Sequence, residues 1–171
     1  MNVLKKAMFI YTLISIILLI GCSSAVTKNQ LPVSKPKDFN FVFNYGVNAK
    51  NRLDTAKEQF TKDMVLEPSV TTNLKLSDDE MNTIYSEMKN INILGYPDNF
   101  EPKSNKKQTP FNTYSLKIIA EGKEKNIYWK DESVSETKEA EQLRKLFKEI
   151  EEIIFNKDEF KKLPEPTSHY L

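Results

Sequence analysis

Side chains that commonly perform covalent chemistry are scarce in this chain of 171 residues. It contains one histidine, His169, and one cysteine, Cys22. A serine or cysteine nucleophile activated by histidine would have to use His169, which is the third residue from the end. Chain ends are usually mobile, whereas a general base must be held within reach of its proton. We therefore do not expect nucleophilic catalysis.

Other catalytic patterns are also missing. The sequence has no HExxH, CxxC, P-loop or GxGxxG motif, and its four glycines leave little material for a phosphate-binding loop. A pair of carboxylates such as Asp54 and Asp63 could serve glycoside hydrolysis, but the sequence does not show whether they meet. We expect a protein that is not an enzyme and that binds no metal or cofactor.

The start of the chain has the features of an export signal. Lys5 and Lys6 are positive, and residues 7–20 are uncharged. Such a run of 14 residues fits the apolar part of a signal peptide and is shorter than the roughly 17 to 25 residues that span a bilayer. Gly21 is small, as a peptidase site requires, and a lone cysteine such as Cys22 cannot form an internal disulfide.

Residues 19–22 read Leu-Ile-Gly-Cys and resemble the lipobox of bacterial lipoproteins. The resemblance implies a signal peptide over residues 1–21, cleavage between Gly21 and Cys22, and lipidation of Cys22. Two acyl chains on Cys22 would hold the protein at the extracytoplasmic face of the cell membrane. The alternative is an uncleaved helix over the uncharged residues 7–26, which leaves the rest of the chain on the same side of the membrane.

The charge of the remaining chain is nearly balanced. The whole chain carries a formal charge of +1, and losing Lys5 and Lys6 leaves one more acidic than basic residue. The densest basic patch contains only Lys103, Lys106 and Lys107, so we expect no nucleic-acid partner. The length fits a single domain, which we place at residues 38–171 and expect to be a monomer. Residues 22–37 are predicted to be the lipidated cysteine and a flexible tether, because they are polar, contain two prolines and lack periodicity.

Alternation of apolar and polar residues predicts about five strands. They cover residues 39–45, 59–66, 69–76, 113–120 and 124–129. Glu67-Pro68-Ser69 and Glu121-Gly122-Lys123 are predicted to be hairpin turns, so the strands should pair antiparallel. Residues 46–58 and 98–112 have no decisive pattern.

Two amphipathic helices should cover one face of this sheet. Ser77 and Glu80 form a capping box before an apolar stripe, and Ser133 with Glu136 predicts a second helix over residues 134–155. The acidic residues 78–80 could suggest a metal site, but capping and the helix dipole explain all three. The order β-β-β-α-β-β-α predicts an α+β fold.

Several short sequence words are similar to those of uncharacterised small lipoproteins of Gram-positive bacteria. They are YGVNAKN at 45–51, TKDMV at 61–65, LKL at 74–76 and KLPEP at 162–166. That likeness implies an exported, lipid-anchored domain and supplies no catalytic residue. The layout, with LSDDE at 76–80, also resembles the emfourin family of protease inhibitors. We therefore expect a non-catalytic binding module with an unknown envelope or protein partner. The alternative is a hydrolase inhibitor that uses loops 46–58 and 98–112.

Overall fold

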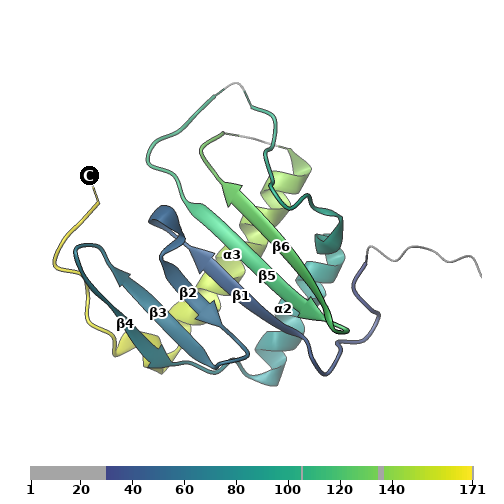
Figure 1. Cartoon of the computed structure of the whole chain (residues 1–171), viewed down its shortest axis with the longest axis horizontal. Coiled ribbons are helices and arrows are strands. Elements are labelled where there is room, and N and C mark those ends of the chain that lie inside the picture. The colour runs from purple at the N-terminus through teal and green to yellow at the C-terminus, as the bar shows by residue number, and fades with distance from the viewer. Residues whose placement is uncertain (1–29, 105, 135–136, 171) are drawn as a thin grey trace, which may run out of the picture.

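The computed structural model describes residues 30–104, 106–134 and 137–170, and its centre is a single six-stranded antiparallel sheet. The strands are β1 (Asn40–Tyr45), β2 (Asn51–Asp54), β3 (Gln59–Met64), β4 (Glu67–Asn73), β5 (Thr113–Ala120) and β6 (Lys123–Lys130). Their spatial order is β4-β3-β2-β1-β5-β6 (Figure 1). The first four strands follow one another as a meander, and the β5–β6 hairpin pairs with the free side of β1.

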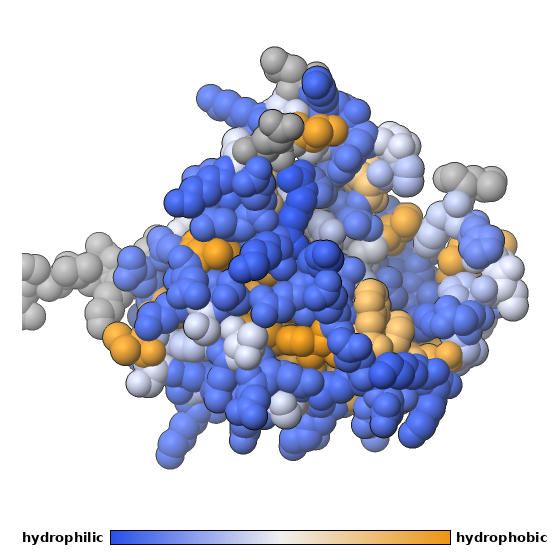
Figure 2. Space-filling view, turned by 180° about the vertical axis from the view of Figure 1, so that it is seen from behind, coloured by the Kyte–Doolittle hydropathy of each residue, from blue (hydrophilic) through white to orange (hydrophobic). Residues whose placement is uncertain are grey.

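Two long helices cover one face of the sheet and lie behind it in Figure 1. They are α2 (Asp78–Asn90) and α3 (Lys138–Asn156), and the short helix α4 (Asp158–Lys161) follows α3. Two 3₁₀ turns, η1 (Val47–Ala49) and η2 (Ile93–Gly95), complete the described elements. Seen from the helix side, the surface is mainly hydrophilic, with apolar groups between the polar ones (Figure 2). The α+β class expected from the sequence is therefore observed.

The alternation in β1 determines the centre of the core. Phe39, Phe41, Phe43 and Tyr45 are each at most 5% exposed, because every second side chain points at the helices. The Phe43 ring lies 5.0 Å from that of Phe147 on α3, centroid to centroid, and stacks at 5.2 Å on Tyr45. Burying one such side chain contributes about 1.5–3 kcal/mol. The alternating aromatic side chains of β1 therefore belong to the hydrophobic core, as expected for an amphipathic strand in a two-layer fold.

The sheet differs from the prediction in two places. It has six strands rather than about five, because β2 lies in the undecided stretch 46–58, where only Leu53 among its four residues is a buried apolar side chain. The predicted turn at residues 67–69 is wrong. The hairpin turns at Val65 and Leu66, with Val65 at a φ of 66°, and Pro68 lies inside β4. Pro68 is tolerated because β4 is an edge strand, where an N–H can go unpaired.

The two predicted helix starts have different outcomes. The first is confirmed, since Ser77 Oγ accepts a hydrogen bond from Glu80 N–H at 3.2 Å and Glu80 Oε2 accepts one from Ser77 N–H at 2.7 Å. The second capping box is wrong. Helix α3 begins at Lys138, and its cap is Thr137, whose hydroxyl accepts from Ala140 N–H. Thr137 provides the same type of capping hydroxyl as Ser133, the predicted cap, and lies closer to the apolar stripe of the helix.

The C-terminal tail packs against the edge of the sheet. Phe160 in the unpredicted helix α4 contacts the Phe60 ring at 5.5 Å, edge to face. Lys62, whose side chain is 9% exposed, donates to Pro164 O at 2.9 Å and pairs with Glu165 at 3.0 Å. The tail therefore supplies the polar partners that a buried lysine requires.

Candidate functional site

A groove of about 650 Å³ lies at the end of the sheet where the described chain begins. We call residues 30–37 the arm. The groove is lined by the arm, by η2 and by the ends of β5 and β6. Its apolar lining comes from Leu31, Pro32, Val33, Leu94, Tyr96, Ile118 and Ala120, and its polar lining from Gln30, Glu121, Lys123, Glu124 and Lys125. This volume and this mixture of side chains are typical of a ligand site.

The arm is packed on the domain, whereas the sequence predicted a flexible tether up to residue 37. Leu31 is 6% exposed and belongs to the hydrophobic core. The Tyr85 hydroxyl on α2 donates toward Pro32 O at 2.7 Å and Ser34 O at 3.2 Å, and Lys89 Nζ donates to Val33 O at 3.3 Å. The arm lacks periodicity because helix side chains, and not a sheet ladder, satisfy its carbonyl groups.

The Tyr85 hydroxyl can act only as a neutral donor to these carbonyls. Burial, and secondarily the negative charge of Glu121, raises the pKa of Tyr85 above its usual value. The hydroxyl therefore keeps its proton at physiological pH. Glu121 belongs to the β5–β6 turn at the rim of the groove. Its charge therefore acts on the Tyr85 hydroxyl that holds the arm.

The rim of the groove is held by Asp38, the residue that directly follows the arm. Its carboxylate accepts hydrogen bonds from the backbone N–H groups of Gly122 at 2.7 Å and Glu121 at 3.0 Å. These bonds lower the pKa of Asp38, the one from Gly122 most strongly. Gly122 has a φ of +68°, a conformation that residues with a Cβ rarely adopt. The rim is thus shaped by the Asp38 carboxylate beside the arm and by Gly122 in the β5–β6 turn.

Charged side chains on the rim are partly neutralised by partners. Lys125, whose side chain is 20% exposed, pairs with Asp98 at 2.5 Å, and Lys117 pairs with Glu124 at 2.6 Å. Across the described part of the chain, no ion pair joins Glu121 or Lys123 to another residue. One free charge of each sign therefore lies beside an apolar floor. Such a rim suits a ligand with an apolar part and polar or charged groups, for instance an extended peptide.

The opposite wall of the groove is fixed to α3. The Tyr96 hydroxyl donates to Glu139 O at 3.0 Å, and the Tyr96 ring contacts Phe100 at 5.3 Å. Burial, followed by the charge of Glu139, raises the pKa of Tyr96 to about 12. This wall is therefore rigid and neutral, whereas the arm wall depends on the contacts of Tyr85 and Leu31.

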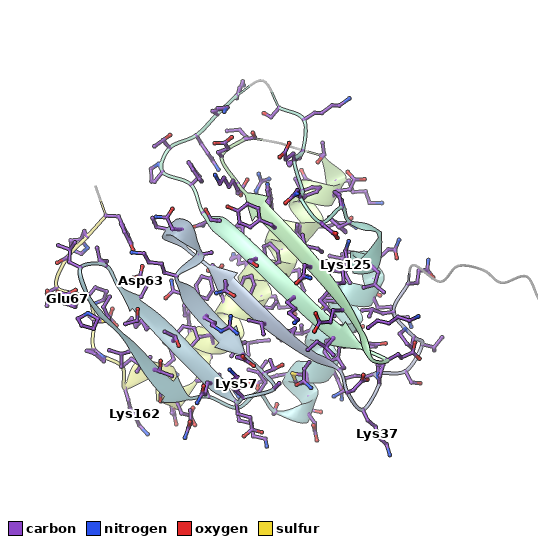
Figure 3. The ribbon with its side chains drawn as sticks, viewed as in Figure 1. Lys37, Lys57, Asp63, Glu67, Lys125 and Lys162 are labelled. Carbon is purple, nitrogen blue, oxygen red and sulfur yellow. The ribbon has the colours of Figure 1, made fainter. Side chains whose placement is uncertain are left out.

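The carboxylates considered for catalysis do not form a pair. Asp54 accepts from Arg52 at 3.0 Å and from Lys57 N–H, and Asp63 accepts from the Tyr170 hydroxyl. Asp54 lies opposite Gln59, four residues from Asp63 along β3, so the backbones of the two residues are about 13 Å apart along the strand direction. In Figure 3, Asp63 lies near Glu67 at one side of the sheet and Lys125 lies toward the other.

The remaining sequence candidates do not converge on a second site. Gly21 and Cys22 lie outside the described residues. His169 is exposed in the tail, and Lys107 pairs with Glu132 at 3.2 Å. Within the described ranges, no three His, Cys, Asp or Glu side chains are placed to hold a metal ion, which includes the acidic turn 78–80.

One unusual carboxyl group was not anticipated from the sequence. Burial raises the pKa of Glu151 on α3 to about 7, and its negative charge in turn contributes to the raised pKa of Tyr45 and of Tyr114. The signal in the sequence is its position four residues after Phe147, beside the apolar stripe of the helix. Glu151 is far along the chain from every groove residue, and we treat it as a determinant of stability.

The chain was also compared with known proteins. No family model, no curated protein and no solved structure matches it. Among the described residues, the structure has no helix that is both long enough and apolar enough to cross a membrane. The function therefore has to be argued from the groove and from the sequence that precedes it.

Proposed function

We propose that this protein is a lipid-anchored lipoprotein of the extracytoplasmic membrane face that binds a partner in its groove and catalyses no reaction. The observation that carries the binding role is the groove of about 650 Å³, with its apolar floor and charged rim. The anchor rests on the lipobox-like residues 19–22 and on the lone cysteine Cys22. Only seven residues separate Cys22 from Gln30, which is eight Cα–Cα steps, so the groove would lie close to the membrane surface, within about 27 Å.

The partner that fits best is an extended peptide segment of an envelope protein. The apolar floor at Leu94, Ile118 and Ala120 can accept an apolar side chain, and burying one contributes about 1.5–3 kcal/mol. Glu121 and Lys123 can contact polar or charged groups on either side of it. A mixture of hydrophobic anchoring and polar orientation is common in pockets that bind selectively.

Photo-cross-linking in intact cells tests this proposal. A photoreactive amino acid at Lys123, on the rim, is expected to capture a specific partner. The matched control is the same amino acid at Lys148, an exposed lysine on α3 that is remote from the groove. Identical products from both positions, or none from Lys123, would argue against the groove as the binding site.

A second candidate function is inhibition of an extracellular hydrolase, and one observation favours it. The loop between η2 and β5 projects beyond the sheet, and several backbone hydrogen bonds hold it to β6 and to the residues that follow (Figure 1). Phe100 N–H donates to Tyr128 O, Gln108 N–H to Glu132 O and Val134 N–H to Lys106 O. Residues 106–110 remain exposed between these anchors. A loop that is held in one conformation loses little entropy on binding, which suits insertion into a cleft.

The inhibitor hypothesis has a direct assay. The purified protein is mixed with secreted proteases and glycosidases from the same cells, and their activities are measured with and without it. An inhibitor should suppress at least one activity, and shortening residues 106–110 should abolish that effect. No suppression at micromolar protein would leave binding in the groove as the better explanation.

A further inference from the structure

The two edges of the sheet are treated differently by the chain. Edge strand β6 is covered by the long loop, since Tyr128 N–H donates to Asp98 O at 2.7 Å and Phe100 N–H donates to Tyr128 O at 2.8 Å. The part of β6 left uncovered carries the charged residues Lys123, Glu124 and Lys125. Charges and covering loops are the usual means of preventing strand addition at an edge.

Edge strand β4 lacks both kinds of protection over most of its length. Residues 68–73 read Pro-Ser-Val-Thr-Thr-Asn and carry no charge, and three of the six are β-branched. The C-terminal tail is hydrogen-bonded to the start of the strand, where the hydroxyls of Thr167 and Ser168 donate to Glu67. Helix α4 also contacts β4, from the helix-covered face of the sheet, where Phe160 meets Phe60. In Figure 1, β4 forms the end of the sheet opposite to β6.

The hydrogen bonds between β3 and β4 show which backbone groups of β4 point away from the sheet. Leu74 N–H donates to Glu58 O, so the backbone of Leu74 points toward β3. Backbone groups alternate along an antiparallel strand, and Ser69, Thr71 and Asn73 therefore point their N–H and C=O groups away from the sheet. Among the described residues, no backbone partner reaches these groups.

We propose that β4 pairs antiparallel with β4 of a second copy of this chain, about a two-fold axis at Thr71. In that register Thr71 faces Thr71 of the second copy, and Ser69 faces Asn73. All three positions have outward backbone groups, so each facing pair can exchange two hydrogen bonds. The proposed dimer differs from the monomer expected from the sequence. The sequence alone does not show that β4 is an edge strand or which of its backbone groups point away from the sheet.

Two further observations favour a second copy over an unrelated strand. The paired edges are identical and uncharged, so no like charges meet across the axis. Thr71 already shares a hydrogen bond of 2.9 Å with Thr61 on the open face, and the axis would extend this row of hydroxyls into the second copy. Among the described residues, β4 is the one edge strand with neither charges nor a covering loop over most of its length, so the pairing closes at two copies and does not continue into a fibre.

Cysteine cross-linking of the full chain in its own cells tests the proposal. Facing residues in a hydrogen-bonded pair have Cα atoms about 5.5 Å apart, which lies within the range of a disulfide. Thr71→Cys is therefore expected to give a disulfide-linked dimer after mild oxidation. The matched control is Ser69→Cys, because the two copies of residue 69 would lie four residues, or about 13 Å, apart. The unsubstituted chain, with Cys22 alone, gives the background.

The expected result is at least about ten times more dimer from Thr71→Cys than from Ser69→Cys, since only the first satisfies disulfide geometry. If Thr71→Cys does not accumulate, Ser69→Cys combined with Asn73→Cys tests the same axis, because those positions face each other. Absence of dimer from the folded variants, or equal amounts from Thr71→Cys and Ser69→Cys, overturns the proposal. A cross-link from Thr71→Cys to a different polypeptide would also overturn it and would assign the edge to a foreign strand.

Discussion

Replacing Glu151 by glutamine should stabilise the protein above neutral pH. Glu151 lies on the sheet-facing side of α3, where its charge is felt by the hydroxyls of Tyr45 and Tyr114. Across the described part of the chain, no hydrogen bond or ion pair joins its carboxylate to another residue. Arg144, two helical turns away on the same side, forms a two-pronged ion pair with Asp131 at 2.6 and 2.8 Å. Among the described residues, burial is therefore not offset by a cation beside Glu151.

The size of the stabilisation expected from Glu151→Gln follows from the raised pKa of Glu151. Burial raises the pKa of Glu151 from 4.5 to about 7, and each unit corresponds to about 1.4 kcal/mol. The difference is at most about 3.5 kcal/mol, and because the side chain still reaches solvent we expect about 1–2 kcal/mol. The folded state favours the protonated carboxyl. The free energy of unfolding should therefore fall as the pH rises from about 4.5 to about 7 and then level off.

Urea unfolding followed by circular dichroism measures this effect. The chain from Gln30 onward is compared with Glu151→Gln between pH 5 and pH 8, since glutamine keeps the shape and removes the charge. The variant should match the wild type near pH 5 and exceed it by about 1–2 kcal/mol at pH 8. The control is Glu152→Gln, whose exposed carboxylate pairs with Lys148 at 3.5 Å and should change stability by less than about 0.5 kcal/mol. A Glu151→Gln variant that is less stable at pH 8 would refute the reasoning, because it would mean that the carboxylate has a stabilising partner.

Three further predictions concern the anchor, the arm and the first helix. Cys22→Ser should abolish labelling by an alkynyl fatty acid in cells, and equal labelling of both chains would rule out lipidation at this position. Tyr85→Phe removes the donor to Pro32 O and should increase proteolytic cleavage within the arm several-fold, while unchanged cleavage would show that the burial of Leu31 alone holds it. Ser77→Ala should lower the free energy of unfolding by about 1 kcal/mol in a urea titration, the typical loss for an N-cap, and an unchanged midpoint would contradict the capping role.

The strands and helices with strong local patterns could be predicted from the sequence. The alternating aromatic residues of β1 and the capping box at Ser77 have the expected positions because each depends on neighbours within a few residues. Strand β2 was missed because Leu53 alone cannot produce an alternating pattern. The turn at Val65 was missed because a β-branched residue seldom adopts a positive φ, whereas Pro68 usually marks a turn.

The groove depends on contacts between residues far apart in the sequence. Tyr85 meets the carbonyl of Pro32 across 53 positions, and Asp38 meets Gly122 across 84. An arm whose polar groups bond to side chains has no periodicity of its own, so it resembles a tether when only the sequence is considered. The sequence could supply the residues of this site but not their proximity.

The sequence by itself determined the lipobox-like start, the scarcity of histidine and cysteine and the local strands and helices, because these depend on residue type and short spacing. Only the tertiary structure decided the order of the six strands, the packing of the arm and the environment of Glu151. It also decided which backbone groups of β4 point outward. The physical reason is the same in each case: burial, pKa and hydrogen-bond direction depend on which distant segments become neighbours in space.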